Sequence, residues 1–269
     1  MKKNLYNLVF LLFVIIVFIY SSCKKTEVDT ETQSATDNSI CEAEFTKILP
    51  AINETAISQP GIKKILSGCD SIWVDSSYSS ATSYWPRKLY IDYKTGCTGS
   101  DGKTRKGLVT VELTKRWSQL GMKAMIAFTN YYVDDLKYEG TVVITRNSST
   151  SFTKTVTGGK CISANWTLEW ATSRTIIFND NGTSINGSDD TYTIEAGSTT
   201  TGKTREGKTY SSKVTKALVK KSGCNWIESG TFDLTPQDHD TRTVDFGDGS
   251  CDDKATLTIK SNTFTFTLN

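Results

Sequence analysis

The sequence predicts a mainly β protein, in which a duplicated antiparallel β unit follows a short N-terminal helical segment. Forty of the 269 residues are threonine, a β-branched type that suits pleated strands better than helices. Apolar and polar residues alternate over 108–113, 141–145, 256–259 and 263–268, as in half-buried strands. Residues 260–262 indicate a hairpin loop between the last two runs. The two copies are expected to form a sandwich or two adjacent β domains.

The first 23 residues have the pattern of a secretory signal peptide. Lys2 and Lys3 precede an unbroken apolar run over 8–20, and Cys23 follows two serines. Thirteen residues are short for a spanning helix, which needs about 20; an uncleaved N-terminal anchor is the alternative. Residues 20–23 resemble a bacterial lipobox. This implies that Cys23 is lipidated and tethers the chain to the cell outer membrane, on its surface or its periplasmic face.

Charge and histidine content narrow the classes of function. Without Lys2 and Lys3, 29 basic residues face 29 acidic ones, so the exported chain has no electrostatic footprint for nucleic acid. The single histidine, His239, cannot form a three-histidine zinc site or a helical pair of zinc-binding histidines. Its polar loop contains no marked nucleophile. The sequence therefore predicts no cofactor and no catalytic residue.

Two segments are expected between the lipobox and the β region. Residues 24–37 contain one large aliphatic side chain and predict a flexible tether. Residues 38–66 predict a helical segment, because Ser39 and Glu42 have the spacing of a capping box. Pro50 is expected to kink or split this helix. Apolar residues recur three or four apart, at Cys41, Phe45, Ile48, Ile52 and Ala56.

An internal repeat indicates how the β region is organised. Residues 67–178 predict a first β unit, 179–189 a polar joint and 190–269 a second β unit. The sequence Gly-Lys-Thr-Arg occurs at 102–105 and again at 202–205. Three further pairs of segments match: 139–145 with 229–235, 161–168 with 251–257, and 173–178 with 262–266.

Five motifs, taken from both repeats, carry a resemblance to one group of proteins. They are WPRKLYIDY at 85–93, GKTRKG at 102–107, NYYVD at 130–134, CNWIESGT at 224–231 and VDFGDGSCDDKA at 244–255. Together they resemble a family of uncharacterised Bacteroidota lipoproteins over most of 68–269. The resemblance implies secretion and a β fold, and it implies no activity.

Six cysteines remain after Cys23, an even number that permits three disulfides outside the cytoplasm. The expected pairs are Cys41–Cys69 and Cys224–Cys251, each within one segment, which leaves Cys97–Cys161. Buried, reduced thiols are the alternative. No Cys-x-x-Cys motif occurs, so the spacing does not indicate a redox or zinc site.

Acidic residues cluster in a turn near the end of the chain. Their oxygens are suitable ligands for Ca²⁺, although the spacing is not that of an EF-hand. The alternative is turn chemistry, because 91–97 and 244–251 share a strand end with Asp, a glycine turn and a cysteine. The candidate calcium ligands are Asp245, Asp248, Asp252 and Asp253.

Three aromatic residues, Tyr78, Tyr84 and Trp85, flank a serine-rich stretch. Exposed rings stack on sugar faces, whereas most aromatic side chains fill cores. The sequence therefore predicts a non-enzymatic binding or structural module, anchored to the membrane through Cys23, with a protein or glycan partner. A surface glycan-binding lipoprotein that uses loop aromatics is the alternative. An enzyme comes third, since paired carboxylates that could hydrolyse glycosides are not recognisable from sequence.

Overall fold

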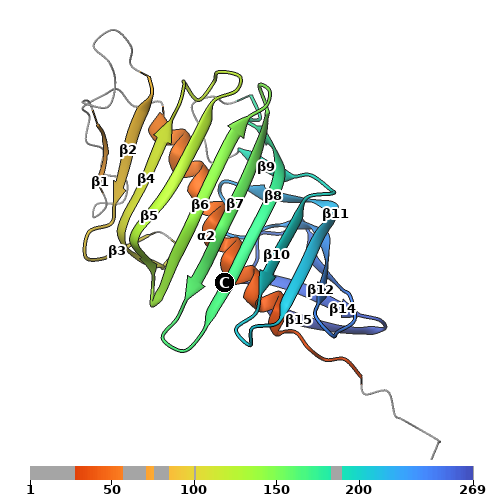
Figure 1. Cartoon of the computed structure of the whole chain (residues 1–269). Helices are drawn as coiled ribbons and strands as arrows, with labels where there is room; N and C mark the ends of the chain where they lie inside the picture. Colours follow the sequence, from red (N-terminus) through yellow and green to blue (C-terminus); the bar gives the residue numbers. More distant parts are fainter. Residues whose placement is uncertain (1–27, 57–70, 76–84, 100, 183–189, 269) are drawn as a thin grey trace, which may run out of the picture. The chain divides into compact units, whose positions relative to one another are not determined.

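The computed structural model describes residues 28–56, 71–75, 85–99, 101–182 and 190–268, and in these it contains one helix and one large antiparallel sheet (Figure 1). The chain divides into Met1–Thr30 and a main compact unit, Glu31–Asn269. The helix is α2 (Gln33–Ala56). The strands of the first half are β1 (Ser71–Val74), β2 (Arg87–Asp92), β3 (Cys97–Thr98), β4 (Thr104–Leu113), β5 (Lys123–Val133), β6 (Leu136–Arg146), β7 (Ser151–Ile162) and β8 (Thr167–Asn179). Those of the second half are β9 (Thr191–Ile194), β10 (Thr199–Lys203), β11 (Thr209–Lys221), β12 (Ser229–Pro236), β13 (Arg242–Asp248), β14 (Lys254–Ile259) and β15 (Asn262–Thr267).

The strands form one antiparallel sheet in nearly sequential order. Two-residue β3 pairs with β4 beside the main path, and β9 pairs with both β8 and β11. The two repeats join where β8 pairs with β10, from Thr199 opposite Ser173 to Lys203 opposite Glu169, and with β9. The mainly β class with an N-terminal helix is confirmed. The strands of both repeats belong to this single sheet rather than to separate β domains.

The helix begins at Gln33, five residues before its expected start at 38. Glu31 accepts hydrogen bonds from the backbone N–H of Ser34 at 2.6 Å and from the Ser34 hydroxyl at 2.8 Å. The Glu31 carboxylate therefore satisfies an N–H of the first turn that has no partner within the helix. The capping box predicted from Ser39 and Glu42 is wrong, because both residues lie inside the helix.

The expected tether over 24–37 is also wrong in its last residues. Ser34 and Asp37 are fully buried, because short polar side chains become part of a core when each has a hydrogen-bond partner there. The helix continues through Pro50 to Ala56. The rest of the predicted helical segment, residues 57–66, lies outside the described residues.

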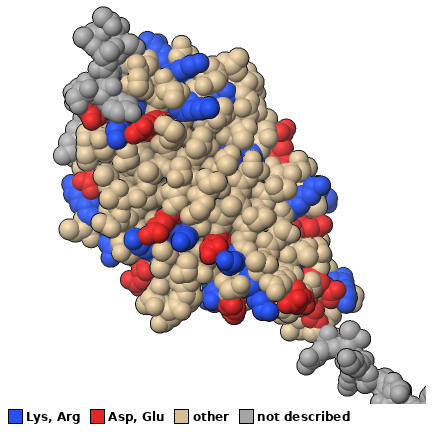
Figure 2. Space-filling view, viewed as in Figure 1, with Lys and Arg blue, Asp and Glu red and all other residues tan. Residues whose placement is uncertain are grey.

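Threonine covers the face of the sheet that points away from the helix. On β7, Phe152, Lys154 and Val156 are buried and alternate with half-buried Thr153 and Thr155, as the period of two requires. Lys154 donates to a helix carbonyl, so the threonines face outward. Figure 2 shows this side of the molecule, where charged side chains lie mostly toward the margins. Threonine and other uncharged side chains therefore form much of this outer surface.

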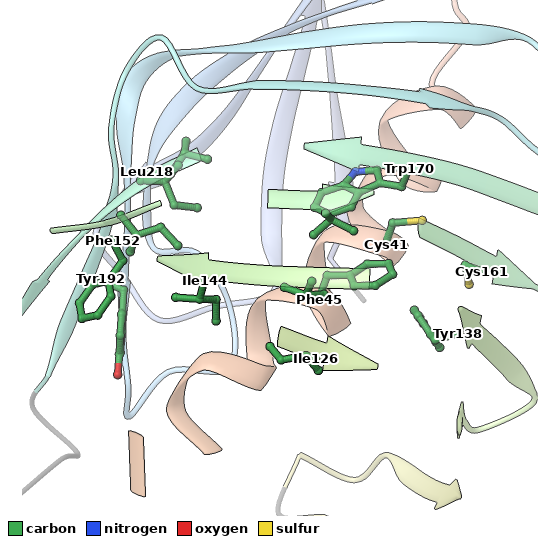
Figure 3. Close-up of a cluster of buried hydrophobic side chains, with 14 of the residues drawn as sticks. Cys41, Phe45, Ile126, Tyr138, Ile144, Phe152, Cys161, Trp170, Tyr192 and Leu218 are labelled. Carbon is green, nitrogen blue, oxygen red and sulfur yellow. The ribbon is translucent and has the colours of Figure 1, made fainter. Parts of the chain in front are cut away.

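The core lies between the helix and the inner face of the sheet (Figure 3). Phe45 of α2 stacks on Trp170 of β8 with ring centroids 5.3 Å apart and an interplanar angle of 6°. Its edges meet Phe128 and Tyr138 at 5.8 and 5.9 Å. Such aromatic contacts contribute beyond the area they bury. One helix side chain thus joins β5, β6 and β8.

A glycine marks a matching irregularity in both repeats. Gly140 on β6 and Gly230 on β12 have φ of 126° and 103°, and the strand register shifts beside each of them. Both follow the pattern of a β-bulge, for which glycine is suited. The match of 173–178 with 262–266 is different, because the first segment continues β8 whereas the second is the separate strand β15.

Candidate functional site: a pocket between the helix and the last strands

Acidic side chains on α2, and Glu31 just before it, form ion pairs with arginines of the sheet. The arginines lie on β4, β8 and β13 and in the turn after β10, so the pairs hold the helix against both halves of the sheet. Buried ion pairs of this kind depend on both partners, because either one alone would be an uncompensated charge. The pairs are Glu31–Arg242, Asp37–Arg205 at 2.5 Å, Glu42–Arg174 at 2.6 Å and Glu44–Arg105 at 3.0 Å.

The repeated Gly-Lys-Thr-Arg motif supplies two of these arginines. Arg105 Nε and Nη2 donate to the Glu44 carboxylate at 3.2 and 3.0 Å. Arg205 donates to Asp37 through its backbone N–H at 3.0 Å and its Nε at 2.8 Å. Forked contacts of this kind suit the planar guanidinium group. The motif thus places an arginine against an acid of the helix in each repeat.

Lys154 lies fully buried on β7, beneath the helix. Its Nζ donates to the backbone carbonyl of Phe45 at 3.4 Å and lies 5.9 Å from the centroid of the Trp170 ring. Burial lowers the pKa of Lys154 to about 8, an effect that Glu42 opposes and Arg174 reinforces. Glu42 is therefore the acid placed near two buried cations.

The free energy of unfolding is expected to rise with pH above about 8, because of Lys154. Below this pH the amine is protonated in both the folded and the unfolded chain. Between the folded pKa of about 8 and the ordinary value of 10.5, the unfolded chain binds more protons, so stability increases with pH. We expect a gain of about 2 kcal/mol between about pH 7.5 and 9.5, measured by urea unfolding.

The matched control for this prediction is Lys154→Met, which keeps the length of the side chain and removes the titrating amine. The variant retains every tyrosine and cysteine that titrates in the same range. Subtracting its pH profile from that of the natural chain therefore isolates the lysine. Equal slopes in the two profiles would contradict the assigned role of Lys154.

A largely apolar pocket lies between α2 and the last strands. The volume of the pocket is about 600 Å³, counted together with its open mouth. Small-molecule sites are mostly apolar concavities with a few polar groups. The pocket is lined by Ala35, Asn38, Ser39 and Glu42 of the helix, by Leu218, Lys220, Phe232, Val244, Phe246 and Phe266 of the strands, and by Asn225, Trp226, Ile227 and Leu268 outside them.

Several polar side chains around the pocket are engaged by the protein itself. The Glu42 carboxylate binds Arg174. Asn38 Oδ1 accepts from Trp170 Nε1 at 3.0 Å and from the Tyr210 hydroxyl at 3.4 Å. A ligand would therefore meet mainly the apolar rings and aliphatic groups, and its binding would rest on burial of apolar surface.

A disulfide holds the loop that carries part of the pocket wall. Cys224 and Cys251 are bonded at 2.13 Å, which confirms this predicted pair. Cys224 precedes Asn225, Trp226 and Ile227 in the loop between β11 and β12, and Cys251 lies between β13 and β14. The bond thus fixes the wall containing Trp226 to the neighbouring loop.

The other two expected disulfides are wrong. Cys41 and Cys161 are free, buried thiols, which excludes both the Cys41–Cys69 and the Cys97–Cys161 pairs. Cys97 is disulfide-bonded, and Cys69 lies outside the described residues. The prediction failed because helix α2 lies across the sheet and brings Cys41 to β7 rather than to its own segment of chain.

Three aspartates of the acidic cluster accept hydrogen bonds from backbone N–H groups of their own turns. Asp245 accepts from the backbone N–H of Gly247 at 2.9 Å, Asp248 from that of Ser250 at 3.1 Å and Asp252 from that of Lys254 at 2.9 Å. These are the short side-chain to backbone bonds that stabilise turns. Among the described residues, Asp253 included, no group of three or more acids, cysteines or histidines could hold a metal ion.

Trp85 and His239 do not line the pocket. Tyr78 and Tyr84 are outside the described residues. Trp85 is half-buried against the core, and the Arg87 guanidinium carbon lies 4.7 Å from the centroid of its ring. His239 is exposed in the turn between β12 and β13. Of the three candidate aromatics, the structure thus describes Trp85 alone.

The buried arginines and the pocket could not be recognised in the sequence beforehand. The recurrence of Gly-Lys-Thr-Arg and the charged residues at inward positions of β7 and β8 were the available signals. No protein-family model, no curated protein and no solved structure matches this chain. No helix in the described part of the chain is both long and apolar enough to cross a membrane.

Proposed function

We propose that this chain is a lipid-anchored binding module of the bacterial cell envelope, and that the pocket between α2 and the last strands takes an apolar ligand. The observation that carries the proposal is the wall of aromatic and aliphatic side chains, to which Phe232, Phe246 and Trp226 contribute. Burial of apolar surface is worth about 25 cal/mol per Å². A small apolar molecule therefore gains binding free energy here without needing a charged partner.

The anchoring part of the proposal rests on the first 23 residues. Their basic start, apolar run and Cys23 support export and lipidation at the outer membrane. The disulfide between Cys224 and Cys251 is consistent with a compartment where disulfides persist. Membership of the Bacteroidota lipoprotein family that the motifs resemble is part of the same proposal.

A non-enzymatic role is proposed because polar side chains of the pocket already bind protein groups. Glu42 is held by Arg174, and Lys220 donates to the carbonyl of Cys224. A general base or nucleophile needs a partner positioned toward the reacting atoms. These side chains instead stabilise the pocket wall.

The test is a titration of the purified chain with N-phenyl-1-naphthylamine, a neutral apolar fluorophore whose emission rises in apolar surroundings. We expect saturable binding with quenching of Trp226 emission, because this indole lines the pocket. The Ile227→Asp variant should weaken binding at least about tenfold, since it places an unpaired carboxylate against the ligand.

Leu120→Asp is the matched control, because Leu120 is 67% exposed and does not line the pocket. It should bind the fluorophore as the natural chain does. Circular dichroism verifies that both variants fold. An equal affinity for the two variants would refute the pocket as the site. Binding of oligosaccharides that is lost in Trp85→Ala would favour the glycan alternative instead.

A further inference from the structure

We propose that Cys41 and Cys161 are a redox-active pair, which a disulfide oxidant converts into a bond that ties helix α2 to strand β7. The spacing of the cysteines does not indicate this pair, because its members are 120 positions apart in the sequence. The inference is independent of the ligand pocket, since neither cysteine lines it.

The two thiols meet in the core. Both side chains are fully buried. Cys161 lies opposite Tyr138 on β6, and the Tyr138 hydroxyl donates at 3.4 Å to the carbonyl of Ile40, the residue before Cys41. Cys41 comes from the helix and Cys161 from β7, and in Figure 3 they lie together on one side of the Phe45 ring. A helix and a strand that are already in contact need only a small approach of two sulfur atoms to form a disulfide.

The surroundings make the two sulfurs chemically unequal. The pKa of Cys161 is lowered by the neighbouring Cys41 thiol and by the Tyr138 hydroxyl, and burial opposes both effects. Tyr138 is placed for this role because it lies directly opposite Cys161 on β6. The pKa of Cys41 is raised by its contact with Cys161 and by burial. Cys161 stays on the sheet when α2 lifts and is the attacking thiol, whereas Cys41 returns with the helix as the resolving thiol.

The reaction balances with a small-molecule disulfide, such as oxidised glutathione, as the oxidant. The Cys161 thiolate attacks one sulfur of the oxidant, forms a mixed disulfide and releases one glutathione thiolate. Cys41 loses its proton, attacks the Cys161 sulfur and releases the second glutathione. The protein pair loses two electrons and two protons, and the oxidant gains them. Because both thiols are buried, the exchange occurs during folding or when α2 leaves the sheet.

Such a bond would fix the helix that the ion pairs hold. The chain between the two cysteines includes β1 to β6 and most of β7. Closing so long a loop restricts the unfolded chain strongly. The bond would thus form only when α2 is packed on the sheet, because only then does Cys41 lie next to Cys161.

Peptide mapping of the natural chain is the first experiment. The protein is refolded in a buffer of oxidised and reduced glutathione, denatured, alkylated and digested with trypsin without reduction. We expect peptide 26–47, which contains Cys41, to be recovered joined to peptide 161–174, which begins at Cys161. Recovery of both peptides alkylated and unlinked, or of Cys41 joined to another cysteine, would overturn the proposal.

A variant measures the effect on stability without relying on mapping. Cys41→Ala with Cys161→Ala retains the Cys224–Cys251 bond. Adding a phosphine reductant should lower the melting temperature of the oxidised natural chain by about 5–15 °C more than it lowers that of the double variant. Equal losses would mean that the pair forms no bond, and would leave the pocket proposal untouched.

Discussion

Replacing Glu42 with glutamine is expected to lower the free energy of unfolding by about 3–5 kcal/mol. Glu42 binds Arg174 at 2.6 Å, and the side chain of Arg174 is 3% exposed. It also raises the pKa of the buried amine of Lys154. Glutamine keeps the shape of the side chain but leaves two buried cations without this anion. Urea unfolding of the two proteins measures the difference.

Glu169→Gln is the matched control, because Glu169 forms an ion pair with Lys203 at 3.1 Å in which both side chains are nearly half exposed. Exposed pairs contribute about 0–1 kcal/mol, so this variant should unfold almost as the natural chain does. A second check is the pKa of Lys154, which should fall further in the Glu42 variant. If the two glutamine variants lost equal stability, the helix would not depend on its buried ion pairs.

Replacing Gly230 with alanine is expected to cost about 3–5 kcal/mol, because two separate penalties combine. The residue has φ of 103°, a conformation that residues with a side chain rarely adopt. A Cβ atom added to it would lie 2.2 Å from the carbonyl oxygen of Ala217 on the neighbouring strand. The backbone of β11 or β12 must therefore move. Thermal and urea unfolding both report the loss.

Gly207→Ala separates the two penalties. Gly207 has φ of 78°, and a Cβ atom added there meets nothing within 4 Å. It should cost about 1–2 kcal/mol, from backbone conformation alone. Gly140→Ala should resemble Gly230→Ala, since its Cβ would lie 2.8 Å from the Cα of Gly159. Similar losses in the Gly207 and Gly230 variants would show that close strand packing at the bulge does not determine the effect.

The ion pairs and the bulges together explain why the helix and the sheet fit each other. Arg105 and Arg205 come from the same repeated motif and bind different acids of α2. Gly140 and Gly230 shift the register of their strands at matching positions of the repeat. A bulge bends and twists a strand locally. The repeated arginine motif thus supplies ion pairs to the helix, and the repeated glycines lie at the bulges of the sheet that packs around it.

The strands could be predicted from sequence because each is a local pattern. The alternation over 108–113 and 256–259 corresponds to buried and exposed faces of β4 and β14. The turn over 260–262 is a tight hairpin, in which Ile259 pairs with Asn262. Side chains that alternate with a period of two reveal a strand whatever the partner strand is. The same holds for the aspartates that cap turns through their own neighbours in sequence.

The start of the helix could not be predicted in the same way. Ser34 and Asp37 are polar, and polar residues near a terminus ordinarily indicate a solvated tether. They are buried because Glu31 and Arg205 provide hydrogen-bond partners. Arg205 is 168 residues from Asp37 in the chain. No local pattern contains information about a partner at that separation.

The sequence by itself indicated the class of fold, the strands over 108–113, 141–145, 256–259 and 263–268, the Cys224–Cys251 bond and the turn chemistry of the aspartates, because these depend on residues near one another in the chain or on simple periodicity. Only the tertiary structure decided that both repeats share one sheet, that α2 lies across it and that Cys41 meets Cys161. It also decided where the pocket lies. These features depend on contacts between segments that are not neighbours in the chain, which only folding brings together.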